Sequence, residues 1–311
     1  MMYCKNTANR AIRAPKVTLE RPVIGTAFPT TRPHMQASLT QMSANMFAEA
    51  FRLRYGQRPL RRLLLPMARR FAGDVITFHD LAVEDLQRPS QWIIEQLCSG
   101  LTVNGADNLP HQGPLIVTCN HPGVMDAMAV FANLPQANVK VIARTRNLLD
   151  VLPNIRQHII FVSEERGQHV ATLRQAIAHL QAGGTLVTFP AGEIEPDPLL
   201  YSASAQDFTD NWSKSVALLA RQVPQAVIVP ASIGGVISKR ARETWVARRY
   251  NKPVARDWVA ATLQFMFQRY RDAHPTLQFG QAVTSSRNRE SLHTAIVEQT
   301  KGLMARFQPD Q

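Results

Sequence analysis

The sequence contains little cysteine, no long apolar run and, over its first quarter, very few acidic residues. Its three cysteines, Cys4, Cys98 and Cys119, are widely spaced. This spacing excludes a disulfide framework and a cysteine metal site, and it is typical of a reducing compartment. No stretch reaches the roughly 18 apolar residues that a spanning helix requires. Because no basic segment followed by an apolar core stands at the start, we expect no secretory signal and a cytoplasmic location.

The shortage of acidic residues makes the N-terminal quarter strongly basic. Residues 1–73 contain 13 Lys and Arg but only Glu20 and Glu49, whereas the remaining residues hold 22 basic and 21 acidic groups. The net charge of +12 therefore belongs to the N-terminal part and not to the body of the chain. Such asymmetry predicts an anionic membrane surface as a partner. A nucleic-acid partner is disfavoured, because no recognised nucleic-acid motif accompanies the charge.

Two segments precede the expected catalytic body. Residues 1–40 contain four prolines and no sustained periodicity, so we predict a disordered basic leader, with an organellar transit peptide as the alternative. Residues 41–98 are predicted to be a basic amphipathic helical segment, with a helix over 41–72 that is broken near Gly56 and Pro59. We expect this segment to contact a membrane, where each basic residue contributes about 1 kcal/mol. The alternative is a helix docked on the body with a solvated basic face.

Residues 99–311 are predicted to form the catalytic domain, because strand-like and helix-like stretches alternate there. The expected strands lie at residues 114–119, 139–144, 158–163, 184–189, 226–231 and 277–283. The expected helices lie at residues 124–134, 147–157, 168–182, 211–222, 255–273 and 287–307. This alternation predicts an α/β fold with a mixed, mostly parallel sheet flanked by helices.

A histidine and a carboxylate follow the first long strand of this pattern. The apolar run stops at Asn120-His121-Pro122-Gly123, and a helix-like run then begins with Asp126 in its first turns. On one continuous helix His121 and Asp126 would lie roughly 140° apart, so they meet only if Pro122 and Gly123 bend the chain. An imidazole held by a carboxylate at the carboxyl edge of a sheet can take a proton from an acceptor. The alternative is a purely structural pair that caps the helix.

Further motifs follow this one in a fixed order. They are Asn104-Gly105-Ala106-Asp107-Asn108-Leu109-Pro110 before the histidine, and Phe189-Pro190-Ala191-Gly192 and Val229-Pro230 after it. The series, over roughly residues 100–240, resembles the phospholipid/glycerol acyltransferase family, which includes lysophosphatidic acid acyltransferases. His121 and Asp126 match its His-x4-Asp motif. Ala191 stands where many members carry Glu, with Glu193 two places later, and this variant is similar to the branch that includes ornithine-lipid and haemolysin-like acyltransferases.

The family's second motif, a Gly and an Arg around a Phe-Ile strand, is matched only in part. Residues 159–163 form the right kind of strand and Arg166 follows it, whereas Arg144 and Arg146 follow the preceding strand. The resemblance implies that an Arg binds the charged head of the acceptor, with Arg166 as first choice and Arg146 as second. Which Arg does so, and whether the acceptor carries a phosphate, is left open.

The resemblance also implies a fold like that of glycerol-3-phosphate acyltransferase, and a mechanism. His121, oriented by Asp126, would act as general base on a (lyso)phospholipid, glycerol phosphate or related lipid acceptor. The acceptor would attack the thioester of acyl-CoA or acyl-carrier protein, which is a co-substrate; no metal ion and no other cofactor is implied. Gly192 is expected to offer a backbone N–H to the oxyanion, and Glu193 to line the site.

Other features have two interpretations each. The long insert 193–210 borders the acceptor pocket or is a plain surface loop, and Trp212 after it is expected to pack rather than to stack on a ligand. The basic segment 239–256 is a solvated helix face or a clamp for phosphates of coenzyme A or for an acidic carrier protein. For the whole chain, the alternative to an enzyme is a catalytically silent lipid-binding peripheral membrane protein of the same fold.

Overall fold

A sheet of seven strands organises the molecule. The computed structural model describes residues 31–53, 58–144, 147–162, 169–283 and 288–307. The strands are β1 Thr102–Asn104, β2 Leu115–Cys119, β3 Val139–Arg144, β4 Ile159–Val162, β5 Thr185–Thr188, β6 Val227–Gly234 and β7 Thr276–Phe279. They lie in the order β1-β7-β6-β2-β5-β3-β4, and all neighbours are parallel except β6 and β7. This mixed, mostly parallel sheet confirms the predicted fold class.

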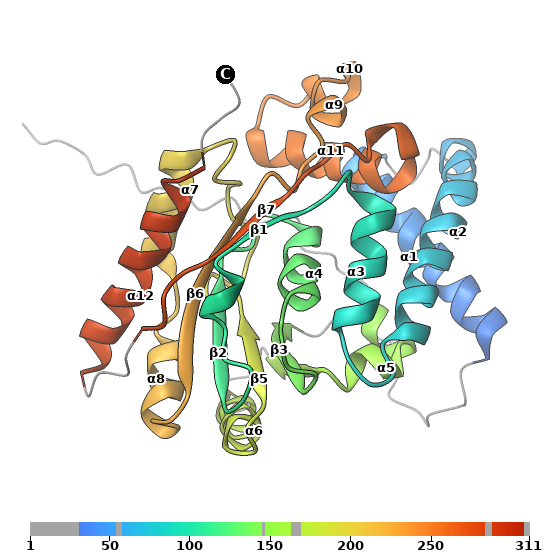
Figure 1. Cartoon of the computed structure of the whole chain (residues 1–311). Coiled ribbons are helices and arrows are strands. Elements are labelled where there is room, and N and C mark those ends of the chain that lie inside the picture. The colour runs from blue at the N-terminus through green and yellow to red at the C-terminus, as the bar shows by residue number, and fades with distance from the viewer. Residues whose placement is uncertain (1–30, 54–57, 145–146, 163–168, 284–287, 308–311) are drawn as a thin grey trace, which may run out of the picture.

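Helices cover both faces of the sheet (Figure 1). They are α1 Arg32–Ala50, α2 Arg58–Leu81, α3 Gln87–Leu97, α4 Val124–Ala132, α5 Pro153–Arg156, α6 His169–Gln181, α7 Ser202–Phe208, α8 Ser215–Gln222, α9 Lys239–Arg242, α10 Trp245–Arg248, α11 Pro253–Met266 and α12 Arg289–Met304. Alternate residues of β2 face two different apolar clusters, Val117 with α3, α4 and α11, and Ile116 with α6, α8 and α12. Both faces are therefore packed, which explains why β2 is a continuous apolar run that is buried throughout.

The centre of the sheet determines where a site can form. β2 lies between β5 and β6, and Thr118 near its carboxyl end is paired with Thr188, the last residue of β5. The turns that follow these two parallel strands, at His121 and at Phe189, therefore leave the same edge side by side. In open α/β sheets this is the edge at which ligands bind.

The first helix corrects the prediction of a disordered leader through residue 40. α1 begins at Arg32, so nine residues of that predicted leader are helical, whereas residues 1–30 lie outside the described residues. Pro33 sits in the first turn of α1, where its missing N–H removes no helical hydrogen bond. Pro33, one of the four prolines on which the prediction of disorder rested, is thus compatible with the start of a helix.

The second helix begins at Arg58, after the predicted break near Gly56, but it continues to Leu81 rather than ending at 72. The two N-terminal helices pack on the body: the Phe71 ring lies 5.9 Å from Phe47 of α1 and 5.0 Å from Phe265 of α11. Their apolar side is therefore docked, as the alternative interpretation expected. Membrane contact by residues 41–98, and the division of the chain at residue 99, stay predictions. Among the described helices, none is long and apolar enough to cross a bilayer.

Several short elements were not predicted, namely β1, α7, α9 and α10. The expected helix 147–157 is a 3₁₀ turn, Asn147–Val151, followed by α5, because Leu152 precedes Pro153 and is pushed away from helical geometry. The expected helix 255–273 ends at Met266. The remaining predicted strands and helices are present, with ends shifted by a few residues.

Candidate active site

The turn after β2 brings His121 and Asp126 into contact, as expected if Pro122 and Gly123 bend the chain. His121 Nδ1 lies 2.7 Å from Asp126 Oδ2. The same oxygen accepts the Gly123 N–H at 2.9 Å, and Oδ1 accepts the N–H of Ala127, so the carboxylate also caps α4. Asp126 is fully buried, whereas 28% of the His121 side chain is exposed. The hydrogen bond to Asp126 assigns the proton to Nδ1 and makes Nε2 the basic atom of the ring.

The side chain of Asn120 fixes the start of this turn. Buried Asn120 donates from Nδ2 to the Ile233 carbonyl at 2.9 Å, and its Oδ1 accepts the Ile233 N–H at 2.8 Å. These two bonds extend the pairing of β2 with β6 by one residue through a side chain. The histidine that follows is therefore held at a defined position on the sheet.

A buried carboxylate, Glu195, lies behind the histidine. Its Oε2 accepts the His121 N–H at 2.6 Å, its Oε1 accepts the indole N–H of Trp212 at 2.7 Å, and its own N–H donates to the His121 carbonyl at 2.8 Å. Burial raises the pKa of Glu195 to about 7, although the hydrogen bonds from Trp212 and His121 act in the opposite direction. Trp212 is 4% exposed, which confirms the prediction of a packing residue.

A second buried carboxylate, Asp197, holds the same segment against β6. It accepts backbone N–H groups of Leu199 and Gly235 at 2.9 Å and of Val236 at 3.0 Å. Burial raises the pKa of Asp197 to about 6. The insert that follows the Phe-Pro-Ala-Gly turn is thus pinned at two points, against the His121 turn and against the end of β6.

The Phe-Pro-Ala-Gly turn packs directly on the histidine. The Phe189 ring centre lies 4.8 Å from that of His121, with the planes tilted by 35°. Gly192 has a φ of +67°, and its N–H donates to the Phe189 carbonyl at 3.0 Å. This N–H closes the turn, and the expected oxyanion role of Gly192 stays a prediction. A Cβ built on Gly192 would lie 3.8 Å from Arg144 Nη2, so a cation from the end of β3 stands beside the turn.

The other predicted site residues have different outcomes. Arg146 and Arg166 lie outside the described residues, so Arg144 is the described member of the three arginine candidates. Glu193 is exposed, and it is Glu195 that contacts the histidine. The signal that could have identified Glu195 is the run Glu193-Ile194-Glu195-Pro196-Asp197, which places three carboxylates directly after a turn at the sheet edge. Within the described ranges, no group of three or more His, Cys, Asp or Glu could hold a metal ion.

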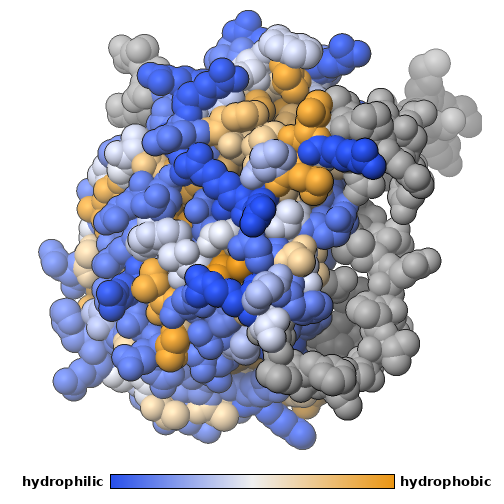
Figure 2. All heavy atoms as spheres, turned by 90° about the vertical axis from the view of Figure 1, so that its right-hand side faces the viewer, coloured by the Kyte–Doolittle hydropathy of each residue, from blue (hydrophilic) through white to orange (hydrophobic). Residues whose placement is uncertain are grey.

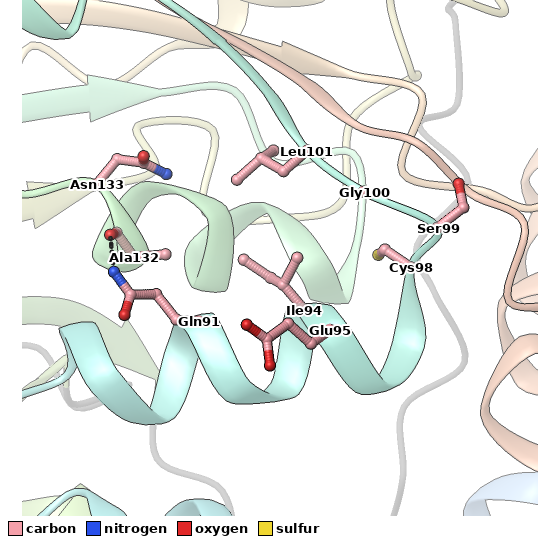
Figure 3. Close-up of a pocket in the computed structure, with 9 residues that line it drawn as sticks. All are labelled: Gln91, Ile94, Glu95, Cys98, Ser99, Gly100, Leu101, Ala132 and Asn133. Carbon is pink, nitrogen blue, oxygen red and sulfur yellow. Dashed lines mark hydrogen bonds between the residues drawn. The ribbon is translucent and has the colours of Figure 1, made fainter.

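A cavity of about 410 Å³ lies away from this cluster, at the opposite end of α4. Figure 3 shows α3 side chains such as Gln91 and Glu95 facing the C-terminal residues of α4, and Gln91 donates to the Ala132 carbonyl at 3.2 Å. Cys98 also lines it, and burial raises the pKa of this thiol to about 12, so the thiolate form is absent at neutral pH. The lining of this cavity contains no histidine, so it offers no pair like that of His121 and Asp126.

Comparisons with known proteins found one family model and a similar solved structure. The family model described as Acyltransferase matches residues 100–234, a range that contains the whole cluster around His121. Among solved structures, the chain is similar to the crystal structure of the 1-acyl-sn-glycerophosphate (LPA) acyltransferase PlsC from Thermotoga maritima. That match has 20% identity and a TM-score of 0.47, and it covers 88% of this chain and 98% of that one. No curated protein matches the chain.

Proposed function

We propose, from the premise that this chain is a member of the phospholipid/glycerol acyltransferase family, that it moves a fatty acyl group from a thioester to a lipid acceptor. The chain is an acyltransferase. What we propose is the identity of its acyl donor and acceptor and the role of each residue in the site. The observation that carries the proposal is the 2.7 Å contact between His121 Nδ1 and Asp126 Oδ2 at the carboxyl edge of the parallel strands.

His121 is proposed as the general base. Its Nε2 takes the proton from the acceptor hydroxyl while the oxygen attacks the carbonyl carbon of acyl-CoA or acyl-carrier protein. The new C–O bond forms, the C–S bond breaks, and the proton passes from Nε2 to the departing sulfur. Asp126 stabilises the imidazolium that exists between these two transfers. A positioned base of this kind contributes about 10²–10⁴-fold to the rate.

Glu195 and Phe189 are proposed as positioning residues. Glu195 holds the main chain of His121 on both its N–H and its carbonyl side, and Phe189 packs against the imidazole. The ring is thereby restrained without being covered, since part of its surface stays exposed. Such preorganisation lowers the barrier because the base does not have to be ordered during the reaction.

The acceptor is proposed to be a (lyso)phospholipid, a glycerol phosphate or a related lipid, taken from the cytoplasmic side by a peripherally bound enzyme. Arg144 beside Gly192 is a candidate for the acceptor's charged group, together with Arg146 and Arg166. A guanidinium suits this role because it binds phosphate through two parallel hydrogen bonds. The intact contact between His121 and Asp126 supports an enzyme over the catalytically silent alternative.

Acceptor-dependent thiol release tests this proposal. Purified protein is given long-chain acyl-CoA or acyl-carrier protein with glycerol 3-phosphate, lysophosphatidic acid, other lysophospholipids or a lyso-ornithine lipid, and the acylated product is identified. We expect release with at least one phosphate-bearing acceptor. Separate Ala variants of Arg144, Arg146 and Arg166 identify the binding arginine by a raised KM for that acceptor, with Arg174→Ala on α6 as control. Vesicle binding without thiol release for any pair would favour the silent alternative.

A further inference from the structure

Helix α10 and the first turns of α11 expose large apolar side chains. Trp245 is 77% exposed, Val254 57% and Trp258 39%. Indole rings combine an apolar body with an N–H donor, and they are enriched at membrane–water interfaces because both parts are accommodated there. Val254 and Trp258 are four residues apart on α11 and share one side of that helix, and α10, which carries Trp245, contacts α11. We treat the three side chains as one apolar patch.

The patch lies on a face that also includes the N-terminal helices. Figure 1 places α9, α10 and α11 together at the top of the molecule, next to α1 and α2. Figure 2, which views this side, shows apolar residues gathered near the top and bordered by hydrophilic ones. On α2, Leu63 is 65% exposed and Leu65 39%.

A basic pocket of about 430 Å³ opens beside this patch, between the end of α1 and the start of α11. It is lined by Phe51, Arg52, Arg249, Tyr250, Asn251, Lys252 and Ala255. Three of these residues are cations and none is acidic. Arg52 has a φ of 53°, a left-handed conformation that glycine adopts more readily, and its guanidinium lies 5.0 Å from the centre of the Tyr250 ring. A cation therefore occupies a helix end at which glycine would be the easier choice.

The neighbouring basic residues are already paired with acidic side chains. Arg242 pairs with Asp257 at 2.6 Å, and Arg248 and Arg256 both pair with Glu243. By contrast, among the described residues Arg52, Arg249 and Lys252 make no ion pair with an acidic side chain. Arg249 and Lys252, the members of segment 239–256 without such an ion pair in the described structure, thus both line the pocket, where an anion would be stabilised.

These side chains make up what we call the docking surface: Trp245, Val254, Trp258, Arg52, Arg249 and Lys252. We infer that the docking surface binds an anionic bilayer, with a lipid phosphate in the basic pocket and the two indoles at the membrane interface. The inference rests on the proposed function, because a lipid acceptor has to be collected from a bilayer.

The position of the docking surface relative to the site fits this purpose. The chain passes from β6 into α9 at the same edge of the sheet as the His121 turn, and a Cβ built on Gly123 would lie 3.3 Å from Val236 Cγ2. Arg242 of α9 also bonds to Tyr201 Oη at 2.6 Å, which joins this region to the insert that holds Glu195. A bilayer bound at the docking surface would therefore lie next to the carboxyl edge of the sheet, from which a lipid acceptor would reach His121.

Vesicle binding tests the docking surface. The full chain, Arg249→Glu/Lys252→Glu and Trp245→Ala are sedimented with phosphatidylglycerol and with phosphatidylcholine vesicles. The matched control is Arg174→Glu/Arg221→Glu, which changes charge equally on exposed sites of α6 and α8. We expect the paired Glu variant to lose about tenfold or more in affinity for phosphatidylglycerol, Trp245→Ala to bind both lipids less, and the control to bind like the parent. Equal binding by the paired Glu variant and its control would overturn the inference.

A second measurement separates this inference from the proposed function. The KM for acyl-CoA, measured with glycerol 3-phosphate in the absence of vesicles, is expected to be the same in the paired Glu variant and its control. A raised KM with unchanged vesicle binding would assign the pocket to the phosphates of coenzyme A and would overturn the inference. Selective loss of vesicle binding in a protein that shows no transferase activity would support the docking surface and contradict the proposed function.

Discussion

Glu195 and His121, 74 residues apart in the chain, bond to each other in both directions. The Glu195 carboxylate accepts the His121 N–H at 2.6 Å, and the Glu195 N–H donates to the His121 carbonyl at 2.8 Å. The insert after β5 is thereby attached to the turn after β2 at the residue proposed as base. The side chain of Glu195 touches no atom of the reaction, so its effect has to pass through the position of His121.

Removing the Glu195 carboxylate should reduce turnover more than binding. In Glu195→Ala the His121 N–H loses its acceptor and the turn relaxes, and a displacement of the base by about 1 Å lowers kcat on the order of 10²-fold. KM should change little, because the residue does not face the substrate. Glu193→Ala is the matched control, since Glu193 is exposed two positions away. An equal kcat in the two variants, measured by thiol release, would contradict the positioning role.

The two buried carboxyls should make stability fall with rising pH. Burial raises the pKa of Glu195 to about 7 and that of Asp197 to about 6, above ordinary values of 4.5 and 3.8. The folded chain therefore holds these protons more tightly than the unfolded chain, and this contribution to folding is present below about pH 4 and lost as the pH rises through about 6 and 7.

Glu195→Gln tests that dependence. The variant cannot titrate at this position, so its free energy of unfolding, from chemical denaturation between about pH 5 and pH 8, should fall less steeply than that of the parent. Other titrating groups are common to both proteins and cancel in the difference. Parallel curves for parent and variant would show that the pKa of Glu195 is not raised by folding.

Asp126→Asn should impair both catalysis and the helix start. Both carboxylate oxygens of Asp126 accept hydrogen bonds, so an amide places a donor against one of these N–H groups. We expect kcat to fall by about 10²–10⁴-fold and the free energy of unfolding to fall by about 1 kcal/mol through the weakened cap. Asp107→Asn, at an exposed position, serves as control in both assays. A kcat no lower than that of the control would remove Asp126 from the mechanism.

Alanine substitutions at Gly192 and Gly183 should separate the cost of backbone strain from an effect on catalysis. Gly192 and Gly183 have φ values of +67° and +81°, and neither has a neighbour close enough to clash with an added methyl group. Alanine at either position should therefore cost about 1–2 kcal/mol of backbone strain. Only Gly192→Ala should also lower kcat, because its turn carries Phe189 against His121. Thermal unfolding and thiol release check the two effects, and full activity in Gly192→Ala would make the turn irrelevant to catalysis.

The contact between His121 and Asp126 could be predicted because its determinants are local. A buried apolar strand, a Pro-Gly bend and a helix start fall within a dozen residues, and each has its own pattern. The mostly parallel sheet was predictable for the same reason, since strands buried on both faces appear as continuous apolar runs. The N-terminal part of α1, which contains Pro33, could not be predicted, because composition alone does not distinguish the first turn of a helix from a disordered leader.

The role of Glu195 could not be predicted from its neighbourhood in the sequence. An acidic residue in a long polar insert is usually solvated, and the choice of Glu193 followed from its closeness to Gly192. What buries Glu195 is a pair of partners from other elements, His121 after β2 and Trp212 before α8. The docking surface was missed for a related reason, since the sequence shows seven basic residues in 239–256 but not which of them are paired within the fold.

The most direct test of the proposed base compares thiol release by the full-length protein with that of His121→Ala, using the donor and acceptor pair on which the parent is active. We expect release by the variant to fall to the uncatalysed background while its unfolding midpoint stays close to that of the parent, because His121 is partly exposed and its ring is not part of the core. Full activity in folded His121→Ala would contradict the assignment of His121 as the catalytic base.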